Sequence, residues 1–381
     1  MNNPTVEDLQ QENCQLKQQL EKAKLQGREI DQMIVDKERE LRLLKQQNEA
    51  SEQARLELER RLQELKLRTQ HMEEPVRLIW REGQKIPREV GRGSDPVVNN
   101  GIVYFKPATN TEIYVYDTVN QQWTQLPNCI NKSCSLAIVN DLLTTIGGYQ
   151  CRDNYSNELF SLTKESDKAH TCVWSKEFQP MKTRRCNTTT LSTQTFLIVA
   201  GGVTTTGRVL KTVEVMNMET HECSVATDLP TPLYSASLVA SEDRLYIVGG
   251  SDKDGDSVRT IFRCLMSSLL PHGRRSGLKK VWKKRKIPNV PVADTTCILV
   301  HGRLLTIGGM NWDGKTTTAV HMYSPSAKRW VVVSHMSLPR SECFAAFLHA
   351  KNELIVVGGY TDKSCTVCNL TDEVELAIAI T

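Results

Sequence analysis

The stretch ELIVVGGYTD (353–362) contains the pattern that decides the fold, an apolar run that stops at two glycines. Nearly the same pattern occurs at LLTTIGGYQ (142–150), FLIVAGGVT (196–204), RLYIVGGSD (244–252) and RLLTIGGMN (303–311). The five doublets are Gly147–Gly148, Gly201–Gly202, Gly249–Gly250, Gly308–Gly309 and Gly358–Gly359. Their first glycines are 54, 48, 59 and 50 residues apart. A pattern that returns at this spacing indicates a protein made of stacked copies of one unit.

Each repeat unit reads as four short strands. Two β-type runs lead up to the doublet, a polar loop follows it, and an alternating strand such as TVEVMN (212–217) comes next. A tryptophan then opens the fourth strand, at Trp123, Trp174, Trp282 and Trp330, and Cys223 takes this position once. The most upstream unit (100–127) keeps the order but has Lys106–Pro107 in place of the doublet. Six units of four strands predict a β-propeller.

The glycines and tryptophans have physical roles in such a ring. Glycine at the end of the second strand lets backbones approach near the axis, and it supplies a positive φ where the chain leaves the blade. We expect each tryptophan to pack between neighbouring blades. With its five doublets and spaced tryptophans, the segment 76–381 resembles the kelch-repeat family. The resemblance implies an all-β six-bladed kelch propeller with four-stranded blades.

The ring is expected to close through an N-terminal strand. The last unit ends with TDEVELAIAIT (371–381), which matches a third strand, so its fourth strand must come from elsewhere. The segment VRLIWREGQKIP (76–87) matches the fourth-strand segment VWKKRKIP (281–288), with Trp80 at the tryptophan position. We therefore predict that a strand near Val76–Arg81 completes the sixth blade and removes the open sheet edges.

Residues 1–72 are predicted to form a long α-helical coiled coil, followed by a linker at 73–75. The segment 6–70 contains no proline and one glycine, and its apolar residues follow an unbroken heptad frame. Asparagine at two a positions favours a parallel dimer, although the partner helix could belong to another protein. The residues expected at the seam are Leu9, Asn13, Leu16, Leu20, Ile30, Ile34, Leu41, Leu44, Asn48, Leu58, Leu62 and Leu65.

One face of the ring is a candidate binding surface. In kelch domains similar to this one, partner peptides commonly bind the face formed by the fourth-to-first and second-to-third-strand loops. The resemblance places Arg340 and Ser341 there as the best match to residues that grip acidic peptides, with Arg184 and Arg185 matching less well. Solvated loop charge is the alternative reading. Two aromatic candidates on the same face are Trp312, which could instead pack against its blade, and Tyr234.

A basic segment, RRSGLKKVWKKRK (274–286), runs from an enlarged third-to-fourth-strand loop into the fourth strand. Nucleic acid, an acidic membrane surface or an import receptor could bind it. Because no interleaved aromatic residue beyond Trp282 supports nucleic-acid readout, we expect a charged surface loop. Its candidate residues are Arg274, Arg275, Lys279, Lys280, Lys283 and Lys284.

The remaining sequence features indicate a soluble cytoplasmic protein without a cofactor. The twelve cysteines are scattered, and neither a signal peptide nor a membrane-spanning run is recognisable, so we expect reduced thiols. The CTVC segment (365–368) has zinc-like spacing but lacks a second pair, so no metal is expected. Some kelch-like propellers are copper oxidases or sugar epimerases, but the eight histidines are dispersed and no catalytic motif is recognisable.

These features favour a non-catalytic scaffold or adaptor, in which a coiled-coil oligomer displays kelch propellers that bind partner proteins or peptides. Two alternatives remain open within this class. One is a substrate receptor of a ubiquitin ligase, although neither a BTB domain nor a RING pattern is recognisable in the sequence. The other is a cross-linker of actin or the cytoskeleton. A propeller enzyme is the least favoured reading.

Overall fold

The computed structural model describes residues 58–61, 63, 76–91, 93–164, 172–241, 244–258, 260–269, 281–286, 293–324, 327, 329–364 and 367–380. The chain divides into two units, and residues Arg77–His321 with Val332–Ile380 form the larger one. In the other unit, the described residues 58–61 and 63 are helical, and the rings of Tyr323 and Trp330 lie 5.5 Å apart. Most of the coiled-coil prediction lies outside the described residues.

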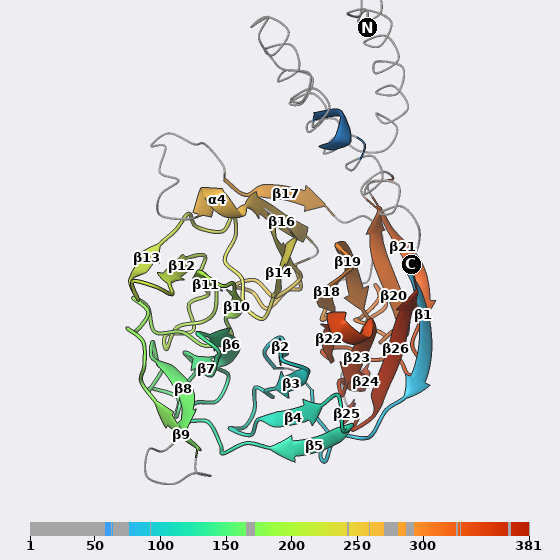
Figure 1. Ribbon diagram of the computed structural model, residues 1–381, viewed down its shortest axis with the longest axis horizontal. Coiled ribbons are helices and arrows are strands. Elements are labelled where there is room, and N and C mark those ends of the chain that lie inside the picture. Colours follow the sequence, from blue (N-terminus) through green and yellow to red (C-terminus); the bar gives the residue numbers. More distant parts are fainter. Residues whose placement is uncertain are drawn as a thin grey trace, which may run out of the picture. The chain divides into compact units, whose positions relative to one another are not determined.

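Six four-stranded sheets follow one another along the chain, and we call them blades 1 to 6 (Figure 1). Blade 1 contains β2 (Val97–Asn99), β3 (Ile102–Phe105), β4 (Tyr114–Asp117) and β5 (Gln122–Gln125). Blade 2 contains β6 (Ser135–Val139), β7 (Leu142–Ile146), β8 (Leu159–Lys164) and β9 (Cys172–Ser175). Blade 3 contains β10 (Thr189–Ser192), β11 (Phe196–Ala200), β12 (Val213–Asn217) and β13 (Cys223–Val225). Blade 4 contains β14 (Ser237–Ser241), β15 (Arg244–Val248), β16 (Thr260–Leu265) and β17 (Lys283–Lys286). Blade 5 contains β18 (Thr296–Val300), β19 (Arg303–Ile307), β20 (Ala319–Ser324) and β21 (Arg329–His335). Blade 6 contains β22 (Phe344–Leu348), β23 (Glu353–Val357), β26 (Val374–Ile380) and β1 (Arg77–Glu82).

The first strands of the six blades form the inner wall of a closed ring. Each contacts the first strand of the next blade, in the order β2, β6, β10, β14, β18, β22 and back to β2 (Figure 1). Buried apolar clusters lie between neighbouring blades, and one of them joins Phe105 and Tyr116 of blade 1 to Phe344 and Ile355 of blade 6. The predicted six-bladed propeller with four-stranded blades is therefore confirmed.

Strand β1 closes the ring, as the sequence predicted. It pairs antiparallel with β26 over six residues, from Arg77 opposite Ile380 to Glu82 opposite Glu375. Trp80 of β1 donates its indole Nε1–H to the Ser334 hydroxyl of blade 5, at 2.8 Å. Segments from opposite ends of the domain thus share one sheet, and this pairing leaves no blade with only three strands.

The glycine doublets act as expected, and Gly308 shows why. Its φ is +58°, which disfavours any residue with a Cβ atom. A Cβ built on Gly308 would lie 2.2 Å from the carbonyl oxygen of Arg340 in the loop before blade 6. The next amide, of Gly309, donates to that same oxygen at 2.9 Å. The first glycines of the doublets in blades 2, 3 and 6 make the same kind of close contact with a backbone oxygen, so these doublets join their blades to a neighbour.

Three of the repeat tryptophans tie their blade to the preceding one through the indole N–H. Trp123 donates its indole N–H to the carbonyl oxygen of Gln84 at 2.8 Å, and Trp174 donates to that of Pro127 at 3.1 Å. Trp282 donates to the carbonyl oxygen of Thr227 at 3.2 Å. Each acceptor follows the fourth strand of the preceding blade, so these rings pack between blades as predicted.

Two local elements were not predicted. A hairpin of β24 (Tyr360–Ser364) and β25 (Val367–Leu370) stands between β23 and β26, where the sequence suggested a polar loop. Its strands read as loop because YTDKS is polar and lacks apolar alternation. A single helical turn, α4 (Met266–Leu269), follows β16 and buries Leu269.

Candidate functional site

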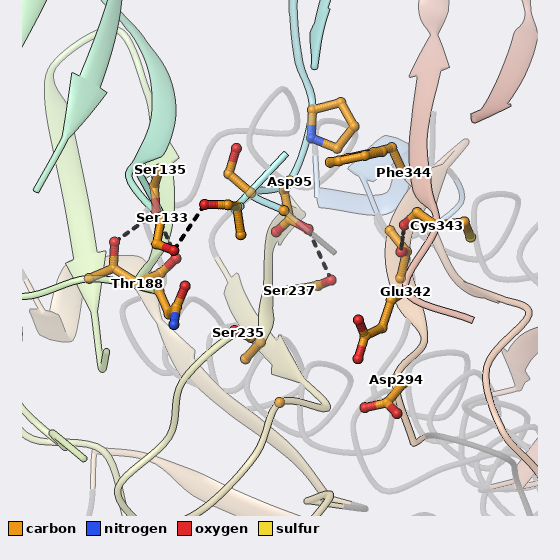
Figure 2. Close-up of a pocket in the computed structure, with 18 of the residues that line it drawn as sticks. Asp95, Ser133, Ser135, Thr188, Ser235, Ser237, Asp294, Glu342, Cys343 and Phe344 are labelled. Atoms are coloured by element: carbon orange, nitrogen blue, oxygen red, sulfur yellow. Dashed lines mark hydrogen bonds between the residues drawn. The ribbon is translucent and has the colours of Figure 1, made fainter. Parts of the chain in front are cut away.

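The loops that lead into the first strands converge around the axis of the ring. They enclose a narrow cavity of about 70 Å³, which we call the channel mouth. Figure 2 shows the polar side chains that these loops bring together. All six blades contribute to the lining. Its hydroxyl, amide and carboxyl members are Ser94, Asp95, Ser133, Ser135, Asn187, Thr188, Ser235, Ser237, Ser251, Asp294, Thr295, Thr296 and Glu342.

Five residues at the channel mouth share one unusual backbone conformation. Ser133, Asn187, Ser235, Asp294 and Glu342 have φ between 48° and 51°, in the left-handed region. That conformation costs a residue with a side chain about 1–2 kcal/mol. Backbone hydrogen bonds between blades hold it: the Asn187 amide donates to the Ser133 carbonyl oxygen at 3.0 Å, and the Glu342 amide donates to that of Asp294 at 2.8 Å. Equivalent side chains are thereby fixed around the axis.

The channel mouth is acidic. Asp95, Asp294 and Glu342 lie in its lining, and none of the described lining residues is basic. The Asp95 carboxylate accepts a hydrogen bond from the Ser237 hydroxyl at 3.2 Å and a long one from the Leu238 amide at 3.4 Å. Burial nevertheless raises the pKa of Asp95 to about 6. Two of these carboxyl groups, those of Asp294 and Glu342, lie near each other in Figure 2.

A second, wider cavity of about 460 Å³ adjoins the channel mouth and shares Ser133 and Asn187 with it. Its wall includes Tyr149, Tyr234 and Val209, together with polar residues of the loop that begins at Asp252. The Tyr149 ring stacks on that of Tyr155, with centroids 5.4 Å apart. Second-to-third-strand and fourth-to-first-strand loops therefore build one continuous surface, which we call the loop face.

Two predicted contact residues prove to be internal. Arg185 and Arg340 are completely buried. Arg340 Nη2 lies 2.7 Å from Glu375 Oε1, and Arg340 Nη1 donates to the carbonyl oxygen of Gly358 at 2.9 Å. Arg185 makes the equivalent contacts: its Nη2 pairs with Glu214 Oε1, and its Nη1 donates to the carbonyl oxygen of Gly201 at 2.9 Å. This burial contradicts a direct role in gripping an acidic peptide, and both residues instead join the doublets of neighbouring blades.

The other predicted contact residues differ in exposure. Ser341 is completely buried beside Arg340, so it cannot meet a partner either. Arg184 is exposed, Trp312 is 65% exposed, and Tyr234 is half-buried in the wall of the wider cavity. The structure therefore leaves Arg184, Trp312 and Tyr234 as candidate contacts.

The basic segment connects β16 to β17, as expected. Of its candidate residues, Arg274, Arg275, Lys279 and Lys280 lie outside the described part of the chain. Lys283 begins β17 and is exposed, and Lys284 pairs through its backbone with Phe262. The described end of the segment, Lys283–Lys286, thus forms the outer strand of blade 4.

Sequence comparison agrees with this architecture. A family model of the KLHDC2/KLHL20/DRC7 Kelch-repeats domain matches residues 187–376. The chain contains a kelch-repeat β-propeller. Kelch-like protein 36 of Rattus norvegicus is 25% identical over 256 residues, which cover 65% of this chain and 39% of the rat protein. Kelch-like protein terF of Aspergillus terreus is 22% identical over 223 residues, 54% of this chain and 47% of that protein.

The match therefore spans less than half the length of these kelch-like relatives. Among solved structures, that of YjhT has the same fold, with a TM-score of 0.60 at 16% identity. It covers 76% of this chain and 95% of YjhT.

The residues of the kelch propeller that sequence reasoning missed are acidic. Glu214 and Glu375 lie on third strands, are almost fully buried and neutralise the two buried arginines. Each also accepts backbone amide hydrogen bonds from the loop that joins the preceding blade to its own, as Glu375 does from Ser337 at 2.7 Å. The usable signal was a glutamate inside an apolar strand, in TVEVMN (212–217) and in TDEVELAIAIT (371–381). A buried carboxylate in such a strand needs a cationic partner.

Neither a metal site nor a membrane helix is evident in the described part of the chain. There, no three His, Cys, Asp or Glu side chains are grouped so that they could hold a metal ion. None of the helices seen there is long and apolar enough to cross a membrane.

Proposed function

We propose that this kelch propeller is a non-catalytic protein-interaction module that binds a segment of a partner protein on its loop face. The observation that supports this most strongly is the channel mouth, where fixed polar side chains from all six blades meet beside an aromatic-walled cavity. Concave surfaces with a few convergent polar groups are typical binding sites.

The charge of the channel mouth favours a basic segment over the acidic peptide that the sequence suggested. The arginines expected to grip acid are internal ion-pair partners, whereas Asp95, Asp294 and Glu342 line the opening. A lysine or arginine side chain that enters the channel mouth would meet carboxylate acceptors, while an acidic one would be repelled. Tyr234 and Trp312 would supply apolar contact area beside it.

We include self-association in this proposal. The heptads of residues 1–72 would pair two chains, and two propellers on one stalk would raise the avidity for a repeated target. The nine cysteines whose side chains are described are all free thiols, which supports an intracellular, reducing compartment.

The test is selection of binders from a random peptide library displayed on phage, with the full chain as bait. We expect enrichment of peptides with a lysine or arginine. A variant with Asp294→Asn and Glu342→Gln should bind these peptides at least about tenfold more weakly, because each charge-assisted hydrogen bond contributes about 1.5–3 kcal/mol.

The matched control is Glu219→Gln, which removes one negative charge from the exposed turn between β12 and β13 of blade 3. It should leave the affinity unchanged. Enrichment of acidic peptides, or equal affinity of the neutralised variant and the control, would refute the proposed partner chemistry.

A further inference from the structure

A buried lysine distinguishes the first blade from the other five. Where the other blades have a glycine doublet, it has Lys106 and Pro107 directly after β3. The Lys106 side chain is completely buried. Its ammonium group donates to the carbonyl oxygens of Pro107 and Asn110, both at 2.6 Å. A positive charge is therefore fixed inside the ring next to blade 2.

Two thiols lie in the loop between β5 and β6, close to this lysine. The Sγ atoms of Cys129 and Cys134 are 3.9 Å apart, and each lies 3.2 Å from the carbonyl oxygen of Asn131. Both side chains are buried among Ile113 and other apolar residues. Asn131 in turn donates from Nδ2 to the carbonyl oxygen of Gly147 at 2.8 Å, which holds the loop in place.

The two thiols differ in acidity. The hydrogen bond from the Cys129 thiol lowers the pKa of Cys134 to about 7, and the charge of Lys106 acts in the same direction against burial. The same hydrogen bond and burial raise the pKa of Cys129. Cys134 is therefore the more acidic of the two thiols, and Cys129 is the one that keeps its proton longer. This division suits an attacking thiolate and a second thiol that resolves the product.

We propose that Cys129 and Cys134 are an oxidation site, at which a hydroperoxide that enters through the channel mouth converts the two thiols into a reversible disulfide. Cys134 is one of the residues that line the channel mouth, and its almost fully buried side chain lies next to Cys129, so peroxide would reach it from this side of the ring. The two sulfur atoms must approach from 3.9 Å to a bond length of about 2.05 Å. This proposal does not depend on partner binding.

The reaction balances with hydrogen peroxide as oxidant. The Cys134 thiolate attacks one peroxide oxygen, the O–O bond breaks, and Cys134 sulfenic acid forms together with hydroxide. The Cys129 sulfur then attacks the Cys134 sulfur, the S–S bond forms, and the sulfenic oxygen leaves as water. In total, two thiols are oxidised and one peroxide is reduced to two waters. A small-molecule thiol reverses the step by exchange.

The molecule contains its own control at Cys343. This residue also follows a left-handed residue, Glu342, directly before the first strand of its blade, and it also lines the channel mouth. The Cys343 Sγ atom lies 4.0 Å from the carbonyl oxygen of Ile307, and burial raises the pKa of Cys343 to about 11. Cys134 and Cys343 therefore have similar positions and are both buried, but only Cys134 has a second thiol beside it.

The test is peptide mapping of the full chain after exposure to hydrogen peroxide, with N-ethylmaleimide added in denaturant to block remaining thiols. Trypsin cleaves after Lys132, so Cys129 and Cys134 separate into two peptides unless a disulfide joins them. The assay uses Cys151→Ser, because exposed Cys151 would fall on the same tryptic peptide as Cys134. We expect the joined peptide, its loss on reduction with dithiothreitol, and full labelling of Cys343.

Two variants and a pH series complete the test. Lys106→Met should slow the reaction on the order of tenfold at neutral pH, which corresponds to one unit in the pKa of the attacking thiol. Cys343→Ser should leave the rate unchanged. In the chain with Cys343 and Lys106 intact, the rate should rise with pH and level off below the ordinary thiol pKa of about 8.5, because the pKa of Cys134 is lowered. Equal labelling of Cys129, Cys134 and Cys343 after peroxide treatment would overturn the proposal without any variant being needed.

Discussion

Arg184 and Arg185 are neighbours in sequence with opposite environments, and they give the sharpest test of the structure. Arg184 is exposed, whereas Arg185 is completely buried and paired with Glu214. We expect Arg185→Met to lower the free energy of unfolding by about 3–5 kcal/mol, because it leaves the buried Glu214 carboxylate without its counter-charge. Arg184→Met removes the same group from the surface and should change it by less than about 0.5 kcal/mol.

The magnitude follows from what Arg185 holds. Besides Glu214, its guanidinium donates to the carbonyl oxygens of Gly201 at 2.9 Å and Thr212 at 3.2 Å. Glu214 would keep the amide of Lys182, at 2.6 Å, so part of its solvation is retained in the variant. Adding Glu214→Gln to Arg185→Met removes the buried carboxylate that has lost its counter-charge. The double variant should therefore recover part of the lost free energy of unfolding, with a coupling energy of about 0.5–3 kcal/mol.

The assay is urea denaturation followed by tryptophan fluorescence. A loss of 3–5 kcal/mol should move the midpoint for Arg185→Met down by on the order of 1 M urea, while Arg184→Met stays at the wild-type midpoint. If the two single variants unfolded at the same urea concentration, Arg185 would not stabilise the ring through a buried ion pair. The prediction that it contacts a partner would then regain support.

Three further predictions concern ring closure, backbone geometry and pH. Deleting residues 76–82 should abolish the cooperative thermal transition, because blade 6 would lose the strand that pairs with β26; an unchanged melting curve would argue against closure by β1. Gly308→Ala should destabilise the ring by more than about 2 kcal/mol, since its Cβ would lie 2.2 Å from the Arg340 carbonyl oxygen. Gly314→Ala is the control, since its φ of +72° is similar but no atom lies within 4 Å, and a similar loss from both would contradict the close-contact argument. The pKa of Asp95 is raised to about 6 in the folded ring, so the folded state binds the proton more tightly and stability falls as pH rises from about 4 to about 6. Asp95→Asn should remove this dependence and gain about 1–3 kcal/mol over wild type at pH 7 relative to pH 4, as measured by denaturation at both pH values; parallel pH profiles would count against a buried carboxylate.

The features of the fold that could be predicted depend on local sequence patterns. The doublets and tryptophans of each blade are spaced along one continuous segment, and their conformational demands do not depend on distant residues. Closure by β1 was predictable because Trp80 repeats the fourth-strand pattern while the last unit lacks it. The hairpin of β24 and β25 was missed because its polar strands carry no alternating signal.

The candidate site was harder to predict. Arg340 and Glu375 are 35 residues apart in sequence, and only the closed sheet brings their charged groups within 2.7 Å. A charged residue in a polar loop reads as solvated unless its partner is known, so Arg185 and Arg340 were assigned to the surface. The acidic channel mouth was missed for a related reason, since its three carboxylates come from three different blades.

The sequence alone determined the number of blades, their strand order and the origin of the closing strand, because each is specified by short-range backbone and side-chain preferences. The tertiary structure decided which charges face solvent, which carboxylates meet on the axis, and that Cys129 lies beside Cys134 near Lys106. Burial and charge pairing depend on residues brought together from different blades, and a linear pattern does not encode those distances.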